Sequence, residues 1–289
     1  MTFPQEPVRR RDLTRLLAIP GAALATQATA CSGPSPVPTS SDIARDPLAE
    51  LDPENWDART AEEVLALPVH TPDPAPSQWD ELGTDDAALD PARAALVDFV
   101  REAYLSPSAL RGLDDDAALE HIITATPEYW VEDLETAWND GGRHFYAFSP
   151  AERYRTVGRP AIAADWFRGE REDLPVLMLG STVAWTVLDT DSHAVGVIAY
   201  RLGIVATIES DGSASEATLR VTVHGLDGCA TTDEGGLPVP ALADSEEHQA
   251  AQKATMDNVI ASPRIPRDAL LDDHSALFEG RSSTNVVCE

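Results

Sequence analysis

The stretch HAVGVIAYRLGIVATIESDGSASEATLRVTVHG, residues 193–225, decides the fold that we expect for this chain. Its last ten residues alternate between apolar and polar side chains, with the period of two that a β-strand imposes. The apolar positions are Ala217, Leu219, Val221 and Val223, and the polar positions are Thr218, Arg220, Thr222 and His224. Such alternation is typical of an antiparallel strand with one covered face. The polar segment 209–216 has turn chemistry and therefore predicts a hairpin.

The segments before residue 193 extend this pattern toward the N-terminus. Three of them are strand-like: HFYAF (144–148), RPAIAADWF (159–167) and LPVLMLGSTVAWTVL (174–188). The connector LDTDSH (188–193) again has the residues of a turn. We therefore expect residues 144–224 to form mainly antiparallel strands.

Helical patterns occupy the residues before these strands. Asp90 is predicted to be the N-cap of a helix that extends to 105, with Pro91 at its first position, and a second helix is expected over 115–124. Thr126 predicts the N-cap of a third helix, which the glycines at 141 and 142 end. Its apolar face comprises Trp130, Leu134, Ala137 and Trp138, and its other face comprises Glu128, Glu132, Asp133 and Glu135. We interpret the acidic face as solvated.

Residues 47–89 are rich in proline, and within them only TAEEVLAL (60–67) predicts a helix, with Thr60 and Glu63 at the spacing of a capping box. Trp56 and Trp79 stand in polar surroundings, and burying an indole removes about 200 Å² from water. We interpret 47–89 as a segment that wraps over the domain and is pinned by its tryptophans. The alternative is an aromatic binding surface. After Gly225 the pattern is less regular, with one helix expected around 245–259.

Helices followed by antiparallel strands predict an α+β domain over 90–289, with helices packed on one face of a curved sheet. This element order, over roughly 90–225, resembles the nuclear-transport-factor-2-like (cystatin-like) roll. The resemblance implies a cone-shaped pocket between sheet and helices. It carries over no catalytic residue, because no short motif of that family is matched.

The N-terminal stretch PVRRRDLTRLLAIPGAALATQATACSG, residues 7–33, has the pattern of an export signal. The 15 uncharged residues from Leu16 to Ala30 are too few to span a bilayer, which takes about 20. RRDLTR, with Arg10 and Arg11 as its pair, resembles the twin-arginine export motif, and ATAC (28–31) resembles a bacterial lipobox, although Ala28 stands where that pattern prefers leucine. An amphipathic first helix of the domain is the alternative.

The lipobox resemblance implies that Cys31 receives a diacylglyceryl group. We then expect an export signal over 1–31, a flexible tether over 32–46 and a lipoprotein anchored to the outer face of the cell membrane. The membrane contact would be made through the lipid alone.

The charge balance excludes one class of partner. The chain has 21 basic and 49 acidic residues, and Lys253 is its single lysine. Nucleic-acid binding requires basic surface to neutralise phosphates, so no nucleic-acid partner is expected.

Motifs that carry chemistry are absent from the sequence. There is no G-x-S-x-G, no H-E-x-x-H and no phosphate-binding glycine loop. His248 in EEHQ lacks the second histidine that zinc would need, and DTDSH (189–193) lacks the spacing of a calcium loop, so we predict neither metal nor cofactor. Arg220 and His224 are the remaining pocket candidates, although alternation would place them equally well on a solvated face.

Three hypotheses for the function remain open. The first is a membrane-tethered, non-catalytic domain that binds a small ligand or an envelope protein. The second is an extracytoplasmic enzyme of the roll type with a histidine or aspartate as base, and the third is a purely structural envelope lipoprotein. A polar cavity between sheet and helices would favour the enzyme, and an apolar cavity would favour ligand binding. A filled centre would favour partner binding or a structural role.

We predict a disulfide between Cys229 and Cys288, the two cysteines that remain after lipidation of Cys31. An oxidising compartment preserves such bonds, and closing a loop of about 60 residues stabilises by roughly 4 kcal/mol. Thiol titration of denatured protein taken from the cell surface should detect no free thiol. Detection of two free thiols would contradict the bond.

Overall fold

A computed structural model describes residues 46–49, 51, 55–76, 79, 82 and 86–278. Its centre is an antiparallel meander of four strands, β2 (Tyr154–Arg171), β3 (Leu174–Asp189), β4 (Val195–Ile208) and β5 (Ala214–His224). The two-residue strand β1 (Val69–His70) pairs in parallel with β2 and gives the sheet order β1-β2-β3-β4-β5. The predicted α+β class and the hairpin of residues 193–225 are therefore confirmed.

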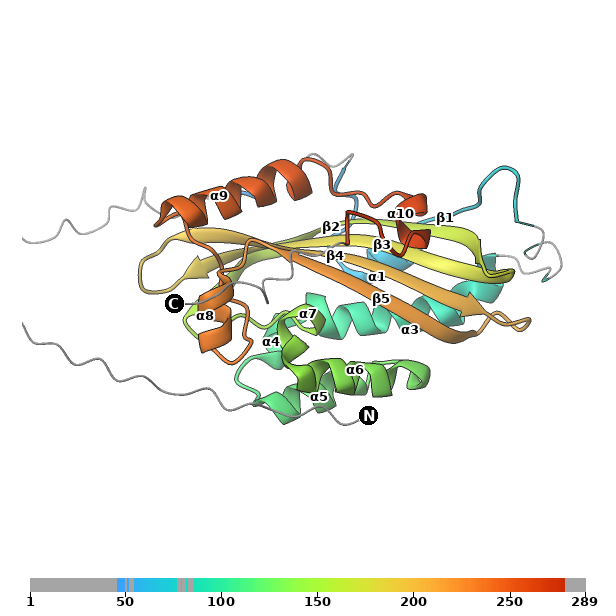
Figure 1. Ribbon diagram of the computed structural model, residues 1–289, viewed down its shortest axis with the longest axis horizontal. Helices are drawn as coiled ribbons and strands as arrows, with labels where there is room; N and C mark the ends of the chain where they lie inside the picture. The colour runs from blue at the N-terminus through green and yellow to red at the C-terminus, as the bar shows by residue number, and fades with distance from the viewer. Residues whose placement is uncertain are drawn as a thin grey trace, which may run out of the picture. The chain divides into compact units, whose positions relative to one another are not determined.

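Helices both precede and follow the meander. Those before it are α1 (Ala61–Ala66), α3 (Asp90–Val100), α4 (Pro107–Leu110), α5 (Asp115–Ile123), α6 (Val131–Ala137) and α7 (Arg143–Tyr146). Short 3-10 or π segments adjoin them, namely η1 (Asp86–Leu89), η2 (Arg101–Leu105), η3 (Glu128–Trp130) and η4 (Trp138–Gly142). Those after it are α8 (Gly228–Asp233), α9 (Glu246–Ala254), η5 (Thr255–Ile260) and α10 (Arg267–Leu271). Figure 1 shows α3, α5 and α6 on one side of the sheet and α9 and α10 on the other.

The observed starts of the helices agree only in part with those predicted from the sequence. The capping box of α1 is present, because the hydroxyl of Thr60 accepts from the backbone N–H of Glu63 and the Glu63 carboxylate accepts in return. Asp90 is the first residue of α3 and not its cap. Thr126 does not cap α6, because its hydroxyl donates to the Ile122 carbonyl at 2.9 Å and so satisfies the end of α5.

The segment HFYAF was predicted to be a strand, and this prediction is wrong. Arg143–Tyr146 forms α7, and the backbone N–H of Phe148 donates to the Ala103 carbonyl at 2.7 Å. The Tyr104 hydroxyl also donates to the Phe145 carbonyl at 2.8 Å. Packing against η2 therefore overrides the strand propensity of this short aromatic run.

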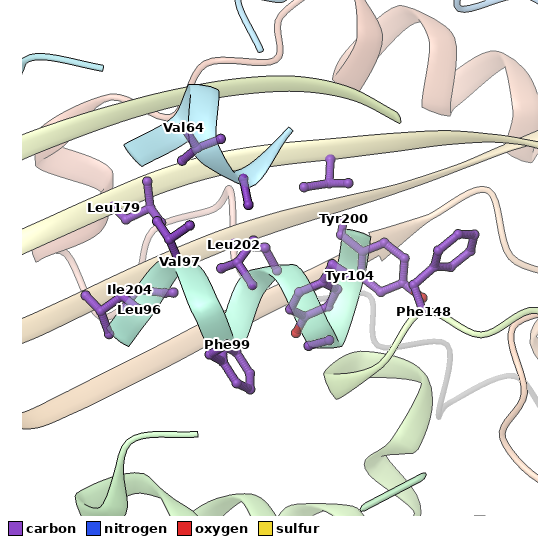
Figure 2. Close-up of a cluster of buried hydrophobic side chains, with 14 of the residues drawn as sticks. Val64, Leu96, Val97, Phe99, Tyr104, Phe148, Leu179, Tyr200, Leu202 and Ile204 are labelled. Carbon is purple, nitrogen blue, oxygen red and sulfur yellow. The ribbon is translucent and has the colours of Figure 1, made fainter. Parts of the chain in front are cut away.

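One face of the sheet packs on α3 through large apolar side chains. Leu179 of β3 and Leu202 and Ile204 of β4 face Leu96 and Val97, as Figure 2 shows. All five are at most 1% exposed, so the centre of this layer is filled. Burial of this kind contributes about 25 cal/mol per Å² of apolar surface and is the main stabilising term of the domain.

The opposite face is also covered, whereas the sequence predicted helices on one face only. Gly180 and Gly203 are paired in register, and a Cβ on Gly203 would lie 2.6 Å from the Phe278 ring and 3.1 Å from Leu270. Alanines continue this small-residue surface under Val259 and Ile260: Ala161, Ala163, Ala184 and Ala199. Because Val176, Met178 and Val205 also face this layer, β3 and β4 are continuous apolar runs, and no alternation revealed the second layer.

The described residues of 47–89 lie against the domain, and two indoles attach them to it. The indole N–H of Trp56 donates to the Ile260 carbonyl at 3.3 Å, and that of Trp79 donates to the Gly169 carbonyl at 2.7 Å. Both side chains are buried, which rules out the alternative of an aromatic binding surface formed by these two residues. At the start of this segment, the Asp46 carboxylate accepts from the Thr186 hydroxyl of β3.

Two buried tyrosines give a matched test of the core. The Tyr200 hydroxyl has no hydrogen-bond partner, whereas that of Tyr104 donates to Phe145. Tyr200→Phe should therefore raise the free energy of unfolding by about 1 kcal/mol, and Tyr104→Phe should lower it by about 1 kcal/mol. Urea unfolding of the two variants measures this difference. Equal losses in both would contradict the assigned hydrogen bonding.

Candidate functional site

The centre between sheet and helices, where the roll resemblance implies a pocket, does not hold one. Leu96 and Val97 of α3 fill the space over Leu179 and Leu202. At the margins of the described part of the chain, two hollowed regions combine polar and apolar walls.

The larger region runs along β5, and we call it the β5 cleft. It consists of two adjoining hollows of about 170 and 440 Å³, which share Asp133, Ala217 and Thr218 as lining residues. The first is also lined by Phe99, Trp130, Leu134, Tyr146 and Leu219. The second is also lined by Tyr129, Arg171, Glu172, Leu174, Val176, Val205, Thr207 and Glu216.

Aromatic side chains form the inner wall of the β5 cleft. The alternation of β5 directs Leu219 toward the helices, while Thr218 is exposed to solvent. Across from them, Trp130 of η3 packs on Phe99 of α3 with ring centroids 4.9 Å apart. Burial and the nearby Asp133 charge raise the pKa of Tyr146 above its ordinary value. This wall is therefore rigid and apolar, with a carboxylate beside it.

The β2–β3 hairpin forms the outer rim. Its turn residues, Glu172 and Asp173, both have left-handed φ values of 53° and 64°. Arg171 and Leu174 pair directly across this two-residue turn. Leu174 is 49% exposed, and it is the one large apolar side chain with that exposure in the described ranges. The turn thus holds an apolar group in water at the mouth of the cleft.

The charges around the cleft are mainly negative. Asp133, Glu172 and Glu216 are all solvent-exposed. The one cation that lines it, Arg171, forms an ion pair with Asp273 at 2.8 Å. The Tyr129 hydroxyl is buried and has no hydrogen-bond partner, and burial raises its pKa. The cleft therefore combines apolar walls, an acidic rim and an unused hydroxyl group.

The second region, of about 480 Å³, surrounds His248 at the other end of the sheet. The imidazole Nε2 lies 2.9 Å from Asp227, and Nδ1 lies 2.5 Å from Asp244. Burial alone would lower the pKa of His248, but the hydrogen bond to Asp244 and the charge of Asp227 outweigh it and raise the pKa. Since both ring nitrogens are engaged, this histidine has no free position to act as a base.

The remaining polar groups of that region also form hydrogen bonds within the domain. Asp227 caps α8 by accepting from the Ala230 N–H at 2.9 Å. Asp189 accepts two hydrogen bonds from the Arg153 guanidinium and one from the Ser192 hydroxyl, and these hold the pKa of Asp189 well below its usual range. The region around His248 is therefore a network that joins loops, without the geometry of a catalytic triad.

The pocket candidates from the sequence, Arg220 and His224, lie on the outer face of β5. The Arg220 guanidinium donates to the carbonyls of Ala269 (3.2 Å), Leu270 and Asp272, and it covers the Phe278 ring. It therefore holds the end of α10. His224 is largely buried and near Arg201, and its Nε2 has no partner. Neither residue lines the two regions described above.

Several sequence predictions fall on residues outside the described ones: Arg10, Arg11, Cys31 and Cys288. Cys229 lies in α8, so its pairing with Cys288 stays a prediction. Among the residues that the structure describes, no three His, Cys, Asp or Glu side chains group as a metal site, and no helix is long and apolar enough to cross a membrane.

The β5 cleft was not predicted from the sequence. Trp130 and Leu134 were assigned to an apolar helix face and Asp133 to a solvated one, and both assignments hold. A cleft arises only because η3 and α6 lie against the inner face of β5, at Ala217 and Leu219, and local spacing does not encode that contact.

Comparison with protein-family models, with curated proteins and with solved structures finds no match to this chain.

His224 generates a prediction of pH dependence. Burial and the positive charge of Arg201 lower its pKa to about 4, against 6.5 for an exposed histidine. Between these values the unfolded chain binds a proton that the folded chain lacks. The free energy of unfolding should therefore fall as pH decreases from 6.5 to 4, by about 3 kcal/mol through this residue.

The measurement is urea unfolding of the wild type and His224→Gln at several pH values. The stability gap between them should narrow by up to about 3 kcal/mol as the pH falls, because glutamine does not titrate. Parallel pH curves for the two proteins would show that His224 does not titrate differently on unfolding.

Proposed function

We propose that this chain is a non-catalytic domain that binds a protein partner through the β5 cleft. The observation that carries the proposal is the exposed Leu174 at the mouth of a cleft whose inner wall is aromatic. Apolar and aromatic side chains that gather around one hollow, with an exposed leucine on its rim, are typical of an interaction site, which a single exposed leucine would not be. The filled centre of the domain favours a partner that binds at the margin.

Two alternatives receive less support, namely binding of a small ligand in place of a protein, and catalysis by an enzyme of the roll type. A small ligand is usually enclosed on most sides, whereas the β5 cleft follows an open strand edge. An enzyme would require a base with a free lone pair near a substrate cavity, and His248 has both nitrogens engaged.

We further propose that the domain acts outside the cell, tethered through a lipid on Cys31. The arginine-rich start, the short uncharged run and the lipobox-like ATAC support this location. The strongly acidic composition also agrees with a domain that does not itself adhere to an anionic membrane. Cys31→Ala should release the protein from the membrane fraction or leave it unprocessed.

Site-specific cross-linking in the producing cell tests the partner. A photo-crosslinking amino acid in place of the exposed Thr218 should give a discrete protein adduct, whereas the same group in place of the exposed Glu120 on α5 should not. Leu174→Glu should reduce the adduct by about fivefold or more, since loss of roughly 1 kcal/mol of apolar contact has that effect on affinity.

The controls decide between the hypotheses. Equal adducts from positions 218 and 120, or no adduct from either, would overturn the proposal. An unchanged adduct in Leu174→Glu would show that the partner binds elsewhere on the surface.

A further inference from the structure

The two edges of the sheet differ in their protection. The edge at β2 is covered, because β1 pairs with Trp166 and Phe167, and Ala58 forms a bridge with Ile162. The edge at β5 has no such cover in the described part of the chain until Leu226 bridges to Pro240, beyond the end of the strand. An open edge presents unpaired backbone groups to any extended chain that lies alongside.

The β5 cleft and this open edge coincide. Residues 216–219 of β5 line the cleft, and Glu216 and Thr218 are exposed to solvent. A strand added at the usual spacing of about 4.8 Å would lie in the cleft and point alternate side chains to its two sides. On the helical side they would meet Trp130 and Leu134, and on the outer side they would lie beside the exposed Glu216 and Thr218.

The charge around the cleft indicates which kind of segment could bind there as an added strand. Three exposed carboxylates surround it, and its arginine is already paired with Asp273. The whole chain carries a formal charge of −28, which repels acidic partners at long range. A segment that alternates lysine or arginine with apolar residues complements both the rim and the walls.

We infer that the β5 cleft binds a basic, extended segment of a protein partner by adding it as a strand to the edge of β5. This inference rests on the proposed function and names the partner class of the same site. Backbone hydrogen bonds and the apolar side chains supply the affinity, while the carboxylates select the basic partner and accelerate its approach.

The probe is a labelled synthetic peptide of about nine alternating lysine and valine residues, studied by fluorescence anisotropy at about 0.15 M salt. Its controls are a glutamate–valine peptide and the lysine–valine peptide N-methylated on alternate amides, which keeps the charge but removes strand pairing. The lysine peptide should bind, and N-methylation should weaken binding by about tenfold or more.

Matched variants separate local from general charge attraction. Asp133→Asn with Glu216→Gln removes two of the three carboxylates around the cleft, and Glu246→Gln with Glu247→Gln removes the same charge from exposed positions on α9. The first pair should weaken binding by about fivefold, and the second by less than about twofold. Circular dichroism and thermal unfolding confirm that both pairs remain folded.

Each outcome bears on the inference. Equal binding of the N-methylated peptide, tighter binding of the glutamate peptide, or equal effects of the two variant pairs would overturn strand addition. If Thr218 cross-links a protein but the lysine peptide does not bind, the inference fails and the proposed function stands. If cross-linking at Thr218 fails, the proposed function fails, whichever peptide binds.

Discussion

The central strands β3 and β4 are buried on both faces, so other parts of the chain must cover each face. The arrangement of the rest of the chain depends on this requirement. Large side chains such as Leu179, Leu202 and Ile204 face α3, whereas Gly180 and Gly203 let α10 and Phe278 lie close to the opposite face. Side chains in place of these glycines would push the second layer away from the sheet. The chain therefore supplies one layer before the meander and another after it, in the order that Figure 1 shows.

The β5 cleft lies where these two layers meet the edge of the sheet. On the helical side, η3 and α6 reach β5 through Trp130 and Leu134. On the outer side, Arg220 joins β5 to the end of α10. Between these contacts the part of β5 around Thr218 stays accessible, and the left-handed turn at Glu172 and Asp173 projects Leu174 beside it. A turn of this type favours asparagine and glycine, so neither residue is the choice that stability alone would make.

The sequence predicts what local chemistry determines. Strict alternation in 216–225 identifies β5 and the faces of its side chains, and the Thr60–Glu63 spacing identifies the start of α1. The two isolated tryptophans correctly indicate a wrapped segment, because an indole in polar surroundings needs an apolar site and an acceptor for its N–H.

Features that depend on tertiary contacts were predicted less well. Thr126 has the chemistry of a cap but serves the preceding helix, and HFYAF has strand propensity but packs as α7. The second layer rests on Val176, Met178 and Val205 as well as on alanine and glycine, so both faces of β3 and β4 lack the alternation that would reveal it. The cleft joins residues from η3, α6, β5 and the β2–β3 turn, and no spacing along the chain relates them.

The attachment of residues 46–89 has a mechanical consequence for a chain held at its N-terminal side. Tension at Asp46 first loads its contact with Thr186, then the indole of Trp56, and later that of Trp79. These contacts follow one another along the segment, so they are loaded in this order, and each is a single hydrogen bond, whereas ladders of paired residues hold the long strands together. The segment is therefore the first part of the domain to detach under tension. Once it has detached with β1, the outer edge of β2 is bare, and a pulled molecule presents two open sheet edges instead of one.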